Sequence, residues 1–198
     1  MHELDHYIYP HRVLHWLVAL AVLLSLASGL TLGFLGYERT VALVGNTLTN
    51  LLYTSHKTLG VTVLLLMTLR IITRIAFVVP DHDPPLNAFE RIVSTSVHHL
   101  LYVGLVVMPL LGWAATATGG FPVEFFHWHL PGLLGKHEAL SETLFMWHER
   151  VGWALVVLIT LHVAGALFHW RIKRDNVMKR MSCLIKSLPT HLLSHAEP

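Results

Sequence analysis

Trp147-His148-Glu149 and Leu161-His162-Val163 lie in one long apolar segment, residues 144–170, whose only charges are Glu149 and Arg150 near its start. The two histidines are fourteen residues apart. On a helix this spacing is about 21 Å and returns to within about 40° of the starting direction. One helix therefore presents both imidazoles on one face, one near each edge of a ~30 Å hydrocarbon core. Titratable side chains are costly in that setting, so they mark a functional site.

The composition is that of a membrane protein. Of 198 residues, 54% are hydrophobic and 13% are charged, about half the charged fraction of a soluble domain. The net charge of +2 is small, and we expect membrane lipid rather than nucleic acid as the surroundings. A single cysteine, Cys183, excludes an internal disulfide, and the absence of a Cys-x-x-Cys-His motif excludes covalently attached haem. Sixteen histidines are the anomaly to explain.

Four hydrophobic stretches are each long enough to cross a bilayer. They are residues 12–34, 53–79, 97–118 and 144–170. We expect a short polar, Gly-containing link at residues 35–52, a Pro- and Asp-containing loop at 80–96, and an aromatic and His-rich connection at 119–143. The prediction is an all-α fold: residues 1–198 form one integral membrane four-helix bundle, with a basic tail at 171–198.

Lysine and arginine are distributed unequally between the two sides of this topology. The side with both termini has ten: Arg12, Arg70, Arg74, Arg91, Arg171, Lys173, Arg174, Lys179, Arg180 and Lys186. The other side has four: Arg39, Lys57, Lys136 and Arg150. Because basic residues accumulate on the cytoplasmic side, both termini are predicted to be cytoplasmic.

Four histidines fall at two matched depths. His15 begins the first span and His162 lies toward the inner end of the fourth, whereas His56 and His148 begin the second and fourth spans on the outer side. Two imidazoles facing one another across helices are the ligand set of a bis-histidine haem b in a bundle core. The sequence predicts two haem b groups, with His15 and His162 on the inner iron and His56 and His148 on the outer iron.

A porphyrin that lies against a helix needs a small residue one turn from its ligand. The residues four positions after the proposed ligands are all small: Ala19, Gly60, Gly152 and Ala166. The residues four positions after the competitors His11, His98, His99 and His169 are large: His15, Tyr102, Val103 and Lys173. Two alternatives stay open. A single membrane histidine also serves as a polar contact or an interfacial group, and a zinc or copper site would need three or four converging ligands.

Several short motifs, in this order and spacing, resemble the prokaryotic cytochrome b561 family over residues 10–181. They are Leu14-His15-Trp16, Ser55-His56-Lys57-Thr58-Leu59-Gly60 with the later Leu69-Arg70, Trp147-His148-Glu149, Leu161-His162-Val163-Ala164 and Lys173-Arg174-Asp175-Asn176. The resemblance implies a four-helix, multi-pass protein of the bacterial inner membrane with two b haems on the ligand pairs named above. It also implies ubiquinone as a redox partner and, in one branch of the family, superoxide oxidation at the outer face.

The expected function is therefore that of a dihaem b-type cytochrome that moves single electrons in the membrane. In this prediction superoxide is oxidised to oxygen at the periplasmic side and ubiquinone is reduced, which is a superoxide:ubiquinone oxidoreductase activity; a quinol is the other possible donor. The first alternative is a haem-bearing anchor subunit that passes electrons between the quinone pool and a periplasmic dehydrogenase or hydrogenase partner. The second is a haem-free scaffold or a haem-based sensor.

Four basic residues are candidates for supporting roles. Arg70 and Arg74 lie on the face of the helix that carries His56, near the inner haem, where arginine pairs with propionates or reaches the interface. Lys57 and Arg150 adjoin the outer ligands, where they anchor propionates, steer superoxide by charge or are ordinary interfacial residues. The outer loop, residues 121–137, is expected at the headgroup layer. It covers the outer haem or edges a quinone pocket, with His129 or His137 handling protons.

Overall fold

The computed structural model describes residues 8–77 and 86–181. Its elements are α1 (Tyr9–Ala76), α2 (Ala88–Thr118), β1 (Val123–Phe125), β2 (Trp128–Leu130), α3 (Glu138–Phe168), the π-helical turn η1 (His169–Lys173) and α4 (Val177–Met181). Three helical stretches of the described chain are long and apolar enough to cross a membrane: α1, α2 and Glu138–Lys173, which joins α3 to η1. The predicted helical membrane architecture is confirmed at this level.

The 68-residue α1 doubles back on itself at two glycines. Gly36 and Gly45 have φ of 69° and 79°, a region that side chains other than glycine rarely adopt. We call residues 9–35 the first arm and residues 46–76 the second arm. The predicted Gly-containing link at residues 35–52 does contain the reversal of the chain, at Gly36 and Gly45. The link is shorter than predicted, because the residues on both sides of these glycines are helical. The buried Thr40 and Thr49 hydroxyls bond the carbonyls of these glycines, 2.6 and 2.9 Å away.

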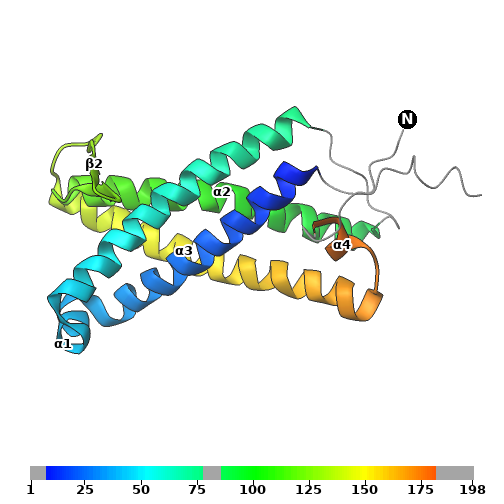
Figure 1. Ribbon diagram of the computed structural model, residues 1–198, viewed down its shortest axis with the longest axis horizontal. Coiled ribbons are helices and arrows are strands. Elements are labelled where there is room, and N and C mark those ends of the chain that lie inside the picture. The colour runs from blue at the N-terminus through cyan, green and yellow to red at the C-terminus, as the bar shows by residue number, and fades with distance from the viewer. Residues whose placement is uncertain (1–7, 78–85, 182–198) are drawn as a thin grey trace, which may run out of the picture.

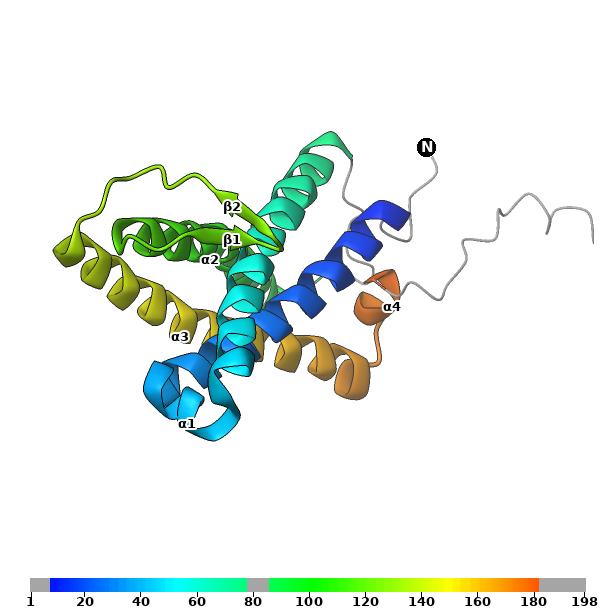
Figure 2. The same cartoon turned by 60° about the vertical axis from the view of Figure 1, so that its left-hand side comes forward.

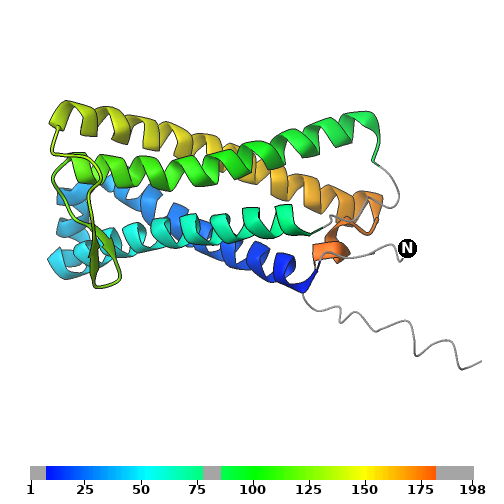
Figure 3. The same cartoon turned by 90° about the horizontal axis from the view of Figure 1, so that it is seen from above.

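The two arms of α1 lie beside each other, α2 packs on α3, and the arms cross these two helices at an angle (Figures 1 and 3). Valine, alanine and methionine side chains from both arms form the buried centre of the bundle: Val18, Ala21, Val22, Val63 and Met67. Tyr102 and Leu105 from α2 and Ile159 from α3 pack against them. Leucines and isoleucines such as Leu23, Leu65 and Ile72 cover the outside, half exposed, as a helix surface in lipid requires.

Both later long helices begin before the predicted spans, because polar residues cap them. Asn87 and Glu90 form a reciprocal capping box, in which the Asn87 side chain accepts from the Glu90 amide, so α2 begins at Ala88. The predicted loop at residues 80–96 was therefore wrong in its second half, because residues 88–96 belong to α2. Residues 78–85 lie outside the described part of the chain. The His137 ring accepts from the Leu140 amide and caps α3, which begins six residues before the predicted span.

The short hairpin of β1 and β2 packs against the second arm of α1 (Figure 2). We call the end of the bundle that holds the hairpin and the reversal of α1 the outer end, and the opposite end the inner end (Figure 3). Lys57 forms an ion pair of 2.8 Å with Glu124 of β1, which also accepts from Thr54 at 3.1 Å. The Phe126 amide donates to the Thr58 hydroxyl at 3.0 Å. The outer loop is thus attached to the helix that carries His56, at the residues directly beside that histidine.

At the opposite end, polar contacts order the segment that follows α3 and attach it to the start of α2. His169 pairs with Asp175 around the π-helical turn, and Lys173 pairs with Glu90 at the start of α2. The Trp16 indole donates to the Met181 carbonyl of α4 at 3.0 Å. Cys183, Lys186 and the remainder of the predicted basic tail, like residues 1–7, lie outside the described residues.

Candidate functional site

His56 and His148 face one another near the outer end of the bundle. Their ring centroids are 6.1 Å apart and the rings are nearly perpendicular, at 85°. His56 comes from the second arm of α1 and His148 from α3, and both side chains are half-buried, whereas the neighbouring Trp147 and Glu149 are exposed. The helices therefore direct these two imidazoles toward the interior of the bundle.

Each of these rings is fixed by a backbone carbonyl of a different helical segment. His56 Nδ1 lies 3.1 Å from the Ser25 carbonyl of the first arm, and His148 Nδ1 lies 3.1 Å from the Met108 carbonyl of α2. A carbonyl oxygen only accepts, so Nδ1 carries the proton in both rings. The Nε2 atom of each neutral ring is then left with a free lone pair. Ser28 Oγ lies 3.2 Å from His56 Nδ1 and adds a second contact.

A glycine makes room for each outer ring. Gly29 follows Ser25 by one helical turn, and a Cβ atom at Gly29 would lie 2.7 Å from His56 Cε1. Gly112 follows Met108 by one turn, and a Cβ there would lie 2.9 Å from His148 Cε1. Both distances are shorter than the usual carbon–carbon contact of about 3.5–4.0 Å. The same device, a carbonyl acceptor followed one turn later by a glycine, occurs on both sides of the outer pair.

His15 and His162 form a second pair, near the start of α1 and near the end of α3. His15 comes from the first arm of α1 and His162 from α3, with ring centroids 6.1 Å apart. His98 of α2 lies nearer still to His162, at 5.1 Å, with its Nδ1 bonded to the Ser94 carbonyl of its own helix. Sequence reasoning set His98 aside, and the structure brings it beside the inner pair.

The spacing of both pairs fits a metal ion held between two imidazoles. Two metal–nitrogen bonds of about 2 Å, with about 1.1 Å from each nitrogen to its ring centre, separate the centroids by roughly 6 Å. Both observed separations, 6.1 Å, match this value. Within residues 8–77 and 86–181 no group of three or more His, Cys, Asp or Glu is placed to hold a metal ion. The donor set that these two sites offer is a pair of imidazoles, as an axially ligated haem requires.

The model of the prokaryotic cytochrome b561 family matches residues 6–182, nearly the whole chain. The chain belongs to this family. The family implies haem b as cofactor and electron transfer as activity, and with the apolar helices it makes this b561-family protein a membrane protein. It is similar to cytochrome b561 homolog 1 of Escherichia coli K12, 28% identical over 85% of this chain and 92% of that protein. Homolog 2 of the same organism is 27% identical over 64% of this chain and 68% of that protein. The probable superoxide oxidase CybB of Yersinia pestis is 24% identical over 85% and 90%.

The candidate basic residues of this b561-family protein differ in their surroundings. Arg70 is half-buried; its Nε donates to the Tyr102 hydroxyl at 3.0 Å, and its NH1 atom is buried with no hydrogen-bond partner among the described residues. A buried guanidinium nitrogen without a partner fits an anionic group such as a propionate. Arg74 is exposed and lines a pocket near the inner pair.

On the outer side, Lys57 is largely covered by its ion pair with Glu124, which offsets its charge. The Lys57 ammonium that bonds it holds the pKa of the Glu124 carboxyl below its ordinary value of 4.5. Arg150 is exposed, with its guanidinium 5.1 Å from the centre of the Trp147 ring. The steering role of these two cations stays a prediction. Lys57 is paired with the Glu124 carboxylate, whereas the exposed Arg150 contacts an aromatic ring, which does not neutralise its charge.

Sequence reasoning missed the residues that shape the histidine sites from other helices. Gly29 and Gly112 make room for the rings, and Glu124 binds Lys57. A glycine within an apolar helix was a visible signal, but which glycine meets which histidine depends on how the helices are registered. His129 and His137 lie in the outer connection, where the His137 ring caps α3.

Proposed function

We propose that this protein is a dihaem b-type cytochrome in which His15 and His162 hold the inner iron and His56 and His148 hold the outer iron. The observation that carries the proposal is the presence of two histidine pairs with the same 6.1 Å centroid separation. Nδ1 of both outer rings is bonded to carbonyls, which leaves Nε2 free as a ligand. Arg70, with a buried unpartnered nitrogen, pairs in this proposal with a propionate of the inner haem, and Arg74 has the same role closer to the interface.

In the proposed topology the chain crosses the bacterial inner membrane four times, through the two arms of α1, α2 and α3. Both termini are cytoplasmic and residues 1–198 form one membrane domain. The distribution of basic residues supports this orientation, because Arg74 lies in the last turn of α1 and Arg171, Lys173 and Arg174 lie in or just after η1. The hairpin and the reversal between Gly36 and Gly45 then face the periplasm.

We further propose that the protein oxidises superoxide at the periplasmic side and reduces ubiquinone. Two superoxide ions each lose one electron to give two molecules of oxygen, and one ubiquinone takes up both electrons and two protons to give ubiquinol. A bound haem b supplies the required one-electron chemistry. The similarity to a probable superoxide oxidase of Yersinia pestis supports this choice of substrate.

The residues of the chain orient the histidine rings and set the charge that an approaching substrate meets. The carbonyl and glycine contacts orient the outer rings, and both inner rings are half-buried in an apolar bundle. At the outer end, Arg150 and Lys57 favour an anionic substrate, while Glu124 opposes it. A change at Glu124 is therefore expected to alter the approach of superoxide as well as the attachment of the hairpin.

The test is a pyridine haemochrome assay with reduced-minus-oxidised visible spectra on purified protein and single alanine variants. We expect two b haems per chain. His15→Ala or His162→Ala should remove one, and His56→Ala or His148→Ala the other. His99→Ala is the matched control, because its exposed ring bonds only the Thr95 carbonyl of its own helix among the contacts found in the described chain.

Two results would contradict these proposals separately. No haem in the wild type, or haem loss on changing His99 but not His56, would refute the ligand assignment. Two haems that superoxide does not reduce, in a protein that co-purifies with a stoichiometric periplasmic subunit, would replace the oxidase by the membrane-anchor function.

A further inference from the structure

The two proposed ligand pairs differ in what holds their rings. Each outer ring bonds a backbone carbonyl of a neighbouring segment, and a glycine makes room for it. Neither inner ring, His15 or His162, forms a hydrogen bond within the described part of the chain, and both contact other rings instead. Because metal-binding histidines are normally oriented by a neighbouring group, we expect another side chain to orient the inner pair.

Positions fourteen residues apart relate the two pairs on the first arm, the second arm, α2 and α3, because this spacing returns a helix to nearly the same face about 21 Å further on. The four positions at the outer pair are Gly29, His56, Gly112 and His148. The corresponding positions at the inner pair are His15, Arg70, His98 and His162. The two positions without a proposed ligand are therefore glycines at the outer pair, but an arginine and a histidine at the inner pair.

His98 takes the place that Gly112 has at the outer pair. Gly112 leaves room for the His148 ring, whereas the His98 ring occupies the equivalent space and meets His162, with its centroid 5.1 Å away and its plane at 84°. Aromatic rings prefer this edge-to-face arrangement. His98 is nearer to His162 than His15 is, at 6.1 Å. Helix α2 thus contacts both histidines of α3, through a carbonyl at one and through a ring at the other.

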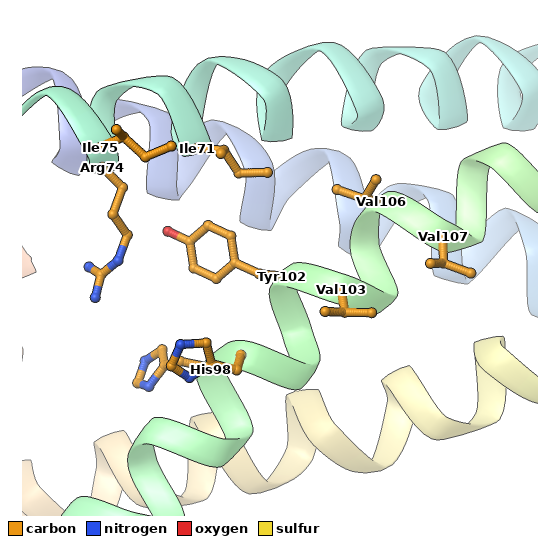
Figure 4. A pocket seen from close by; sticks show the side chains of 9 residues that line it. Ile71, Arg74, Ile75, His98, Tyr102, Val103, Val106 and Val107 are labelled. Carbon is orange, nitrogen blue, oxygen red and sulfur yellow. The ribbon is translucent and has the colours of Figure 1, made fainter.

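The His98 ring is held by its own helix. Its Nδ1 atom donates to the Ser94 carbonyl at 2.6 Å. Figure 4 shows His98 at one end of a pocket of about 580 Å³ between α2 and the second arm, so packing does not fix the ring on that side. His99 makes the same kind of bond, to the Thr95 carbonyl, but has no ring contact among the described residues. A bond within the helix therefore accounts for His99, but not for the approach of His98 to His162.

We propose that His98 is the positioning residue of the inner iron site: its ring fixes the rotation of the His162 imidazole, as the carbonyls fix the outer rings. The proposal rests on the proposed function, because it concerns a haem held by His15 and His162. His98 is not a ligand in this scheme and acts only through His162. The relative orientation of two axial imidazoles determines the low-spin EPR signal of a bis-histidine haem, and a misoriented ligand binds the iron more weakly. The outer pair is thus held by backbone carbonyls and the inner pair by a side chain.

The test uses purified full-length holoprotein, its haem content, its low-spin EPR spectrum and the rate at which it gives up haem to apomyoglobin. We expect His98→Ala to keep two haems, to change the EPR signal of one of them, and to release that haem about tenfold faster, a loss typical of removing a group that orients a metal ligand. His98→Phe keeps a flat ring and should restore both quantities towards the wild type. His98→Leu removes the ring but keeps its bulk, so the test does not depend on the folding of the alanine variant.

Two further variants assign the effect to the inner site. His99→Ala removes the neighbouring ring, which bonds the carbonyl of its own helix, and should change neither the EPR spectrum nor the rate of haem release. In the proposed function, His56→Ala retains only the inner haem. Adding His98→Ala to it should change the one remaining EPR signal.

Three outcomes would overturn the proposal. Wild-type EPR signals and haem release in both His98→Ala and His98→Leu would exclude an orienting role. Loss of one haem in His98→Ala, together with two haems in His15→Ala, would make His98 the ligand. A change in His98→Ala that His98→Phe does not restore would assign the role to the ring nitrogens instead of the ring contact. Failure of the proposed function is separate, since it would appear in proteins that retain His98, as wild type without haem or as two haems in His162→Ala.

Discussion

Replacing Gly112 by alanine is the most direct test of how the outer site is built. The new Cβ would lie 2.9 Å from His148 Cε1 and 3.1 Å from Nδ1, whereas unstrained contacts are about 3.5–4.0 Å. The ring or the helix must give by roughly 0.5–1 Å. The Nδ1 bond to the Met108 carbonyl, now 3.1 Å, has little room to lengthen before it is lost.

The size of the effect follows from two costs. A metal-binding histidine is oriented by the hydrogen bond of its other ring nitrogen. Losing that bond typically lowers metal affinity by about 10–100-fold, or roughly 1.4–2.7 kcal/mol. Overpacking of the helix contact costs about 1–3 kcal/mol of folding stability. In the proposed dihaem protein we therefore expect Gly112→Ala to lower the occupancy or shift the midpoint potential of the outer haem, while the inner haem is unchanged. Haemochrome content and a redox titration followed in the visible region measure these quantities.

Variants at two further glycines distinguish the loss of the histidine hydrogen bond from the overpacking of the helix contact. Gly104 of α2 would place a Cβ 2.8 Å from Leu155 Cδ2, so Gly104→Ala crowds the same pair of helices without touching a histidine. Gly165 has no neighbouring atom within 4 Å of an added Cβ and is the neutral control. The reasoning would be refuted if Gly112→Ala kept both haems at wild-type potential and differed from Gly104→Ala only in unfolding temperature.

Three other changes test the two ends of the bundle. Glu124→Gln should lower stability by about 0.5–1 kcal/mol at pH 7. Because Lys57 holds the Glu124 pKa below 4.5, this difference should be full above pH 4.5 and vanish as the pH falls through the lower pKa of the folded state, as thermal unfolding at several pH values would reveal. Asp175→Asn should cost about 1–2 kcal/mol, because it weakens the hydrogen bond between His169 and residue 175, and a denaturant titration in detergent measures the loss. Arg150→Glu should slow superoxide-driven haem reduction and weaken its dependence on ionic strength; an unchanged rate would exclude steering by this residue.

Which histidines approach one another could be predicted because it depends on helix geometry. A fixed rise per residue gives each histidine a depth, and matched depths on antiparallel helices bring the rings together. The structure places His15 beside His162 and His56 beside His148, while their role as haem ligands stays a prediction. The membrane-crossing character of the helices likewise followed from length and hydropathy.

Contacts between helices could not be predicted in this way. The approach of Gly29 to His56 and of Gly112 to His148 depends on the rotation and register of packed helices, which hydrophobic patterning leaves open. His98 was set aside because a large residue follows it by one turn, yet that rule concerns its own helix and says nothing of His162 on another. The early start of α2 could have been predicted from the sequence, because an Asn followed three residues later by a Glu is typical of a capping box.

The hydrogen bonds of the outer rings link every long helical segment of the described chain. His56 joins the two arms of α1, and His148 joins α3 to α2, whereas the pair of His15 and His162 uses only the first arm and α3. The inner pair can therefore form in a half-assembled chain, but the outer pair is oriented only after all these segments have docked. In the proposed ligand assignment, haem at the outer site would therefore report that all of these segments have docked.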